Sequence, residues 1–156
     1  MKKSLEKLFL ESNSGIVELN GEYIYPIYEI NKIFRRLVIT FVSSKEIPAQ
    51  GINLKVINGT LLIGKTESDH MVLWQDRSPK EVDVIVNAKS INGFNLKIWN
   101  SWRTNYKGAE ISHAWLGNCG MKVNILNENY INIRCSDGEG EANFEDLEVN
   151  INIYTD

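Results

Sequence analysis

The clearest strand pattern in the sequence lies near its C-terminal end, in Leu147-Glu148-Val149-Asn150-Ile151-Asn152-Ile153-Tyr154. Aliphatic and polar residues alternate along its whole length, so every second side chain lies on the same face of an extended chain. This period of two predicts a β-strand with one buried and one exposed face. We therefore expect its Leu, Val and Ile side chains to point into a core that other strands complete.

Short stretches of similar character recur along the chain, with turn residues between them. Predicted strands include 33–42, 70–75, 121–126 and 130–135, and the last two are expected to form a hairpin over 127–129. Together the stretches predict an all-β chain of roughly nine to eleven short strands, packed as an antiparallel β-sandwich of jelly-roll type. A closed barrel is the alternative architecture.

Turn signals punctuate this pattern as three Asn-Gly pairs, Asn20-Gly21, Asn58-Gly59 and Asn92-Gly93. A type I′ turn needs a positive φ at both central positions, which Asn and Gly tolerate. The pairs predict three hairpins, joining 16–19 to 23–30, 53–57 to 60–63 and 82–86 to 94–103. The region 104–120 lacks a clear strand pattern, and we expect it to be irregular.

Length and composition predict a single domain over residues 1–156. A hydrophobic content of 43% and a charged content of 24% are ordinary values for a globular chain and predict no membrane span. The net charge of −3 disfavours nucleic acid as a partner, because phosphate-backbone binding needs a basic face. Two cysteines in a chain with an adequate core do not require a disulfide framework.

The N-terminal residues 2–11 predict a short amphipathic helix. Leu5, Leu8 and Phe9 stand at the i, i+3, i+4 spacing of one helical face. Glu6 and Lys7 interrupt the apolar run that a secretory signal needs. We therefore expect a helix that caps one end of a sheet, and a cytoplasmic location.

The stretch 94–103 contains the first candidate binding surface. Strand alternation places Lys97, Trp99 and Arg103 on one face, opposite Phe94 and Ile98. An outward indole flanked by cations is suited to anchor a protein partner or to stack on a sugar ring. The alternative is structural, with Trp99 packed beneath residues 104–120 and covered by Arg103.

The second candidate surface is acidic. Residues 137–148 contain six carboxylates and no basic residue, and five of these carboxylates are candidate binding groups: Asp137, Glu139, Glu141, Glu145 and Asp146. The spacing partly resembles an EF-hand loop, but Ala142 stands where the sharp turn needs glycine and the flanks are strands. We predict no metal site. A solvated acidic loop of this kind can steer a basic partner.

Catalytic signals are weak. His70 and His113 are the two histidines, and the pairing of His113 with Cys119 as a nucleophile has no supporting motif around it. A histidine beside Trp115 more often serves packing than chemistry. We predict no enzymatic activity, no catalytic residues and no cofactor.

Two functional hypotheses follow. The first is an interaction protein, such as a cytoplasmic inhibitor or immunity factor, that engages a basic protein through the acidic residues. The second is a carbohydrate-binding β-sandwich that uses Trp99, with Trp74 or Trp115, to stack on sugars.

Overall fold

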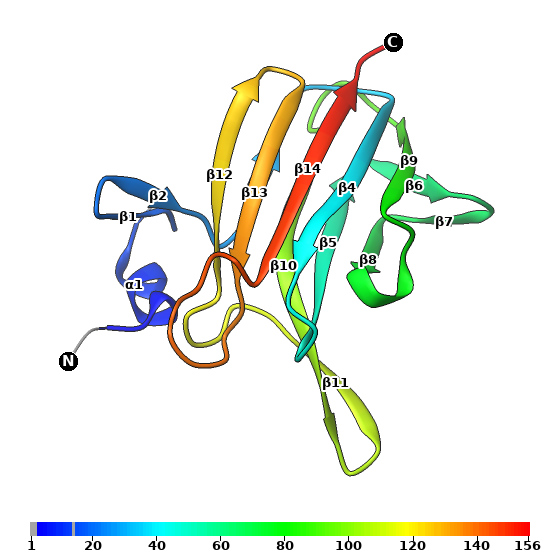
Figure 1. Cartoon of the computed structure of the whole chain (residues 1–156). Coiled ribbons are helices and arrows are strands. Elements are labelled where there is room, and N and C mark those ends of the chain that lie inside the picture. The colour runs from blue at the N-terminus through cyan, green and yellow to red at the C-terminus, as the bar shows by residue number, and fades with distance from the viewer. Residues whose placement is uncertain (1–2, 14) are drawn as a thin grey trace.

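A computed structural model describes residues 3–13 and 15–156 of the chain (Figure 1). It is nearly all β, with 58% strand and 7% helix, and its antiparallel strands form a sandwich-like arrangement. This confirms the predicted fold class. The fourteen strands of the described residues exceed the predicted nine to eleven, because some predicted strands are divided and the region 104–120 contains further strand.

The larger sheet has seven strands and contains residues 147–154, the stretch with the clearest strand pattern. Its order is β12 (Gly120–Asn127), β13 (Tyr130–Ser136), β14 (Leu147–Tyr154), β4 (Arg36–Ser44), β9 (Glu81–Ala88), β6 (Gly59–Ile63) and β7 (Thr66–Ser68). β14 lies between β13 and β4, so its backbone is paired on both sides. Leu147, Val149, Ile151 and Ile153 are all buried, which confirms the predicted inward face.

The second sheet has five strands. Its order is β11 (Ala109–His113), β10 (Asn95–Tyr106), β5 (Ala49–Ile57) and β8 (His70–Trp74), and β3 (Tyr28–Ile30) also pairs with β10. Ile52, Leu54, Leu96 and Ile98 are fully buried in the core that this sheet shares with β14 and its neighbours. Each such side chain stabilises the fold by about 1.5–3 kcal/mol relative to an exposed one.

The N-terminal elements lie at one end of the sandwich (Figure 1). α1 (Leu5–Glu11) begins after Ser4, whose side chain accepts a hydrogen bond from the Lys7 amide, and β1 (Val17–Leu19) pairs with β2 (Glu22–Ile24). Leu5 is buried, as expected of a capping helix. The predicted helix started at residue 2, which lies outside the described residues. Within those residues, no helix has the length and apolar character to cross a membrane.

Two tight turns have a positive φ at both central residues, and each joins two neighbouring strands of the same sheet. Asn20 (φ 54°) and Gly21 (φ 81°) join β1 to β2, as predicted. Lys107 (φ 51°) and Gly108 (φ 82°) join β10 to β11 in the same way. The expectation that residues 104–120 are irregular is therefore wrong for their first half, which forms a projecting hairpin (Figure 1).

The other two Asn-Gly pairs do not form the predicted hairpins, because the strands that flank each of them belong to different sheets. Gly59 starts β6, where a Cβ atom would lie 2.7 Å from the carbonyl oxygen of Asn87 on β9. Glycine is needed at this position for close approach of two backbones. Asn58 also donates to the Asn92 carbonyl at 3.1 Å, which ties the two crossing connections together. A short 3₁₀ turn, η1 (Gln75–Arg77), follows β8.

Candidate functional site

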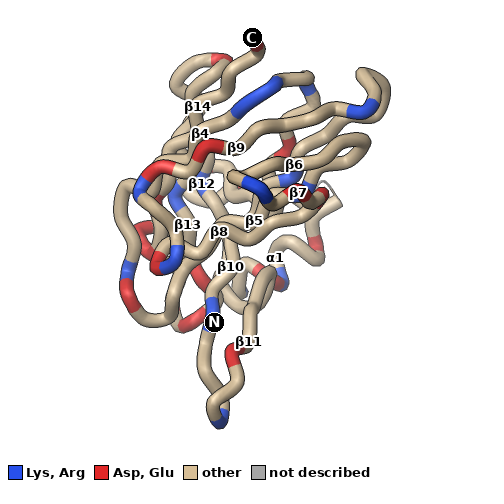
Figure 2. The backbone as a smooth tube through the Cα atoms, turned by 90° about the vertical axis from the view of Figure 1, so that its right-hand side faces the viewer, with Lys and Arg blue, Asp and Glu red and all other residues tan. Residues whose placement is uncertain are grey.

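The predicted site residues fall into two groups in the structure. Lys97, Trp99 and Arg103 lie on β10, on the face of the five-stranded sheet opposite Leu96 and Ile98. The others belong to the connection between β13 and β14, which we call the acidic loop (residues 137–146), at the end of the sandwich near α1 (Figure 1). Basic residues are scattered along the backbone trace (Figure 2).

Trp99 is not an exposed platform. Its side chain is 8% exposed, and its ring lies between those of His70 and Trp115, with centroid distances of 5.3 and 5.1 Å. The prediction of an outward indole is wrong, because the segment after β11 folds back and places Trp115 over it. The structural alternative is correct on this point. Arg103, however, covers Trp74 instead of Trp99, 4.8 Å from the ring centroid.

The two cations on β10 are engaged within the chain. Arg103 donates to both carboxylate oxygens of Asp76, from Nη1 to Oδ1 at 3.2 Å, and this hydrogen bond and charge lower the pKa of Asp76. Lys97 lies 3.7 Å from the carboxylate of Glu29. Neither side chain is thus held free for a ligand.

Both histidines also have partners within the fold. His70 donates from Nε2 to Asn53 at 3.1 Å, and His113 Nε2 lies 2.8 Å from the hydroxyl of Thr104. Cys119 donates to Asn100 at 3.5 Å, and burial raises the pKa of its thiol to about 11. A protonated, buried thiol is a poor nucleophile.

The acidic loop is built around two buried carboxylates. Asp137 and Asp146 are 0% and 3% exposed, and Lys45 Nζ lies 2.7 Å from the first and 3.4 Å from the second. Gln50 donates a further hydrogen bond to Asp137 at 2.8 Å. We name Lys45, Asp137 and Asp146 the ionic cluster. The prediction that these two aspartates line a binding surface is wrong, because they face inward and hold the loop.

Burial and neighbouring charges shift the pKa values of two members of the ionic cluster, Asp146 and Lys45. Burial raises the pKa of Asp146, although Lys45 and the Asp137 amide act in the opposite sense. Partial burial lowers the pKa of Lys45, but its hydrogen bonds and its attraction to both aspartates outweigh this and raise the pKa overall. The lysine therefore stays charged and compensates for the buried negative charge.

Hydrogen bonds fix the backbone of the loop as well. The Asp137 amide donates to the Asp146 carboxylate at 3.0 Å, and the Glu139 amide donates to Asp137 at 2.9 Å. The Asn143 amide donates to the hydroxyl of Ser136 at 3.0 Å. With both ends and its middle bonded to buried groups, the loop has one defined conformation.

Neighbouring segments hold the loop from outside. Gly138 lies so close to Trp102 that a Cβ atom would be 2.4 Å from the indole, and the same atom would be 2.5 Å from the carbonyl oxygen of Leu116. Trp102 donates to the carboxylate of Glu139 at 3.0 Å, and Asn118 donates to the carbonyl of Gly140 at 2.8 Å. The loop is thus packed against β10 and against the segment before β12.

Three glutamates of the loop face solvent. Glu139, Glu141 and Glu145 are exposed, and none of them forms an ion pair with any residue in 3–13 or 15–156. Nowhere in the described part of the chain do three or more His, Cys, Asp or Glu side chains form a group that could hold a metal ion. We call Glu139, Glu141 and Glu145 the glutamate surface. It is an exposed set of negative charges on a rigid support.

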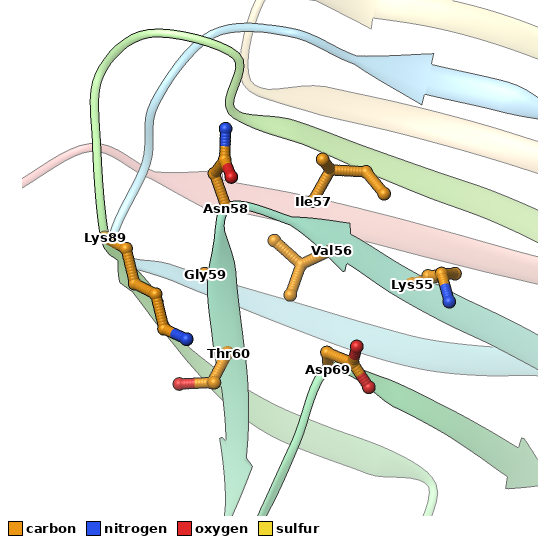
Figure 3. A pocket seen from close by; sticks show the side chains of 8 residues that line it. All are labelled: Lys55, Val56, Ile57, Asn58, Gly59, Thr60, Asp69 and Lys89. Atoms are coloured by element: carbon orange, nitrogen blue, oxygen red, sulfur yellow. The ribbon is translucent and has the colours of Figure 1, made fainter.

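A hollow of about 480 Å³ lies in another part of the molecule, where β5 crosses to β6 (Figure 3). Lys55 and Lys89 line it together with Asp69. This mixture of charges does not define a ligand class, and none of the predicted site residues lines the hollow.

The sequence analysis did not identify the residues that hold the acidic loop in place. Lys45 and Gln50 lie on a different part of the chain from the acidic loop, and no local pattern links them to it. Comparison with known proteins adds no residues, because no family model, no curated protein and no solved structure matches this chain.

Proposed function

We propose that this protein is a non-enzymatic interaction protein, of the cytoplasmic inhibitor or immunity type, that binds a basic protein through the glutamate surface. One observation carries the proposal. Glu141 and Glu145 are exposed and have no cation partner among the described residues, yet the loop that carries them is fixed by the buried ionic cluster.

The physical basis is preorganisation. A flexible acidic segment loses conformational entropy when it binds, whereas a loop already held in one conformation avoids most of that cost. Fixed negative charges also attract a basic partner over a Debye length, which raises the association rate at low salt. Carboxylates held in this way suit a cleft that normally accepts phosphate groups.

The test compares association rates. The triple variant E139Q/E141Q/E145Q removes the charge of the glutamate surface, and the control E81Q/E128Q/D69N removes the same charge from exposed positions elsewhere. The partner is first captured from cells of the source with the wild-type protein and identified by mass spectrometry. We expect the first variant to associate roughly tenfold more slowly at low salt, and the control to match the wild type.

Salt provides the second arm of the test. Association of the wild-type protein should slow steeply as salt rises, while the glutamine variant should respond much less. Equal association rates for wild type and variant at all salt concentrations would refute the proposal.

No observation favours the carbohydrate hypothesis. The burial of Trp99 removes the side chain on which it was based, and Trp74 is covered by Arg103. Retention of the wild-type protein on a glycan array would restore it.

A further inference from the structure

An apolar groove opens beside the acidic loop. It has a volume of about 290 Å³ and lies between α1 and the connection from β2 to β3, with Phe9, Leu10, Pro26, Ile27 and Trp115 among its lining residues. Pockets for small-molecule ligands usually have volumes of about 300–1,000 Å³. The groove lies at the low end of this range, and its mostly apolar lining is suited to one large apolar side chain.

The wall formed by Trp115 is rigid. Its indole nitrogen donates to the Pro26 carbonyl at 3.0 Å, and one face of its ring packs against Trp99. Its backbone has a φ of 59°, a conformation that costs a bulky residue of order 1–3 kcal/mol and that proteins often keep at functional positions. The strain is maintained although the ring is still 42% exposed.

The rim of the groove exposes apolar side chains to water. Leu10, which lines the groove, is 82% exposed, and Leu116, which follows Trp115 in the chain, is 50% exposed. Such a concentration of apolar surface next to a groove is typical of a contact surface that a partner covers.

One acidic side chain, that of Glu6, lines the same groove. Glu6 exchanges hydrogen bonds with Gly117, whose amide donates to the Glu6 carboxylate at 3.3 Å. Gly117 also packs against Gly138, so the segment that Glu6 contacts is in contact with the acidic loop as well. The three exposed glutamates of that loop disfavour an anionic lipid surface, and they disfavour a second copy of the chain, which would bring the same carboxylates.

We propose that the groove receives one large apolar side chain of the basic partner, flanked by lysine or arginine residues that contact Glu6 and the glutamate surface. This inference rests on the proposed function and adds the apolar anchor to it. In such interfaces a buried apolar side chain supplies affinity, and the surrounding charges supply association rate and specificity.

The test uses two blocked pentapeptides, Lys-Lys-Phe-Lys-Lys and Lys-Lys-Ser-Lys-Lys, titrated into the full-length ¹⁵N-labelled protein. Binding is followed through the indole N–H signal of Trp115 and the amide signals of α1. We expect the Phe peptide to bind about tenfold more tightly than the Ser peptide, a difference of about 1.4 kcal/mol from partial burial of the ring.

Variants separate the two claims. L10S changes an exposed groove residue and should abolish the preference for Phe, while L126S, at a 54% exposed position on β12, should keep it. The variant E139Q/E141Q/E145Q should lower the affinity for both peptides by a similar factor. If that variant leaves both affinities unchanged while the Phe preference remains, the proposed function fails and the apolar groove stands.

Three results of the peptide titrations would overturn the groove proposal itself. They are equal affinities for the two peptides, absence of any shift with the Phe peptide at about 10 mM, and a Phe preference that survives L10S. Sedimentation of the wild-type protein as a dimer that L10S dissociates would also overturn it, because the occupant would then be a second copy.

Discussion

Replacing Lys45 by Met should destabilise the protein and loosen the acidic loop. Lys45 contacts Asp137 and Asp146, which are 0% and 3% exposed, so its removal leaves two buried carboxylates without a cation. Removing one partner of a fully buried ion pair costs about 3–5 kcal/mol. The Lys45 side chain is 32% exposed, and solvent screens part of the interaction, so we expect a loss of about 2–3 kcal/mol near neutral pH.

Equilibrium unfolding in urea measures this loss, and Lys122 provides the matched control. Its side chain is 25% exposed, but its partner Glu22 is 50% exposed, so K122M removes a lysine of similar exposure from an open ion pair. The control should lose less than about 1 kcal/mol. K122M also removes a cation–π contact, because Lys122 Nζ lies 4.4 Å from the centroid of the Phe144 ring. The difference between the two losses is therefore a lower bound on the contribution of the buried carboxylates.

The destabilisation by K45M should shrink as the pH falls. Burial already raises the pKa of Asp146, and without Lys45 its folded-state pKa rises further above the unfolded value. The folded variant then binds this proton more tightly than the unfolded chain does. Its stability increases as the pH falls through the raised pKa, and the gain is complete near the unfolded value of about 3.9. A K45M loss equal to that of K122M, or constant between about pH 7 and about pH 4, would show that Lys45 does not compensate the two buried carboxylates.

Three further substitutions or reagents probe other parts of the account. W99A should lower the free energy of unfolding by about 3–5 kcal/mol, measured in urea, because a buried ring is lost; a change below about 1 kcal/mol would place Trp99 at the surface instead. G138A should cost about 1–3 kcal/mol in the same assay, since its methyl group meets the indole of Trp102. A thiol reagent such as DTNB at about pH 8 should leave Cys119 and Cys135 unmodified in the folded protein and modify both in urea, because both are buried and burial raises their pKa values; rapid labelling without urea would contradict this.

Alternation of residue types predicted the core strands well, because side-chain direction in a strand depends only on local geometry. The inward face of β14 follows directly from the sequence 147–154. The Asn-Gly signal was less informative. It marks a tight change of direction, but it does not say whether the next strand returns beside the first or crosses to the other sheet, which depends on long-range packing such as that of Gly59 against β9.

The candidate site shows the same division between local and distant information. Alternation placed Trp99 on the correct face, but its cover comes from Trp115 and His70, which lie on other elements. The acidic residues were recognised as a group. Their separation into buried and exposed members depends on Lys45, which reaches them from the segment between β4 and β5.

Amide hydrogen exchange across residues 137–146, compared between wild type and K45M, tests whether the acidic loop is preorganised, and it needs no partner. We expect the amides of Asp137, Glu139 and Asn143 to be protected in the wild-type protein, and K45M to remove this protection while the amides of β14 stay protected. Free exchange of these three amides in the wild-type protein would show that the loop is not preorganised.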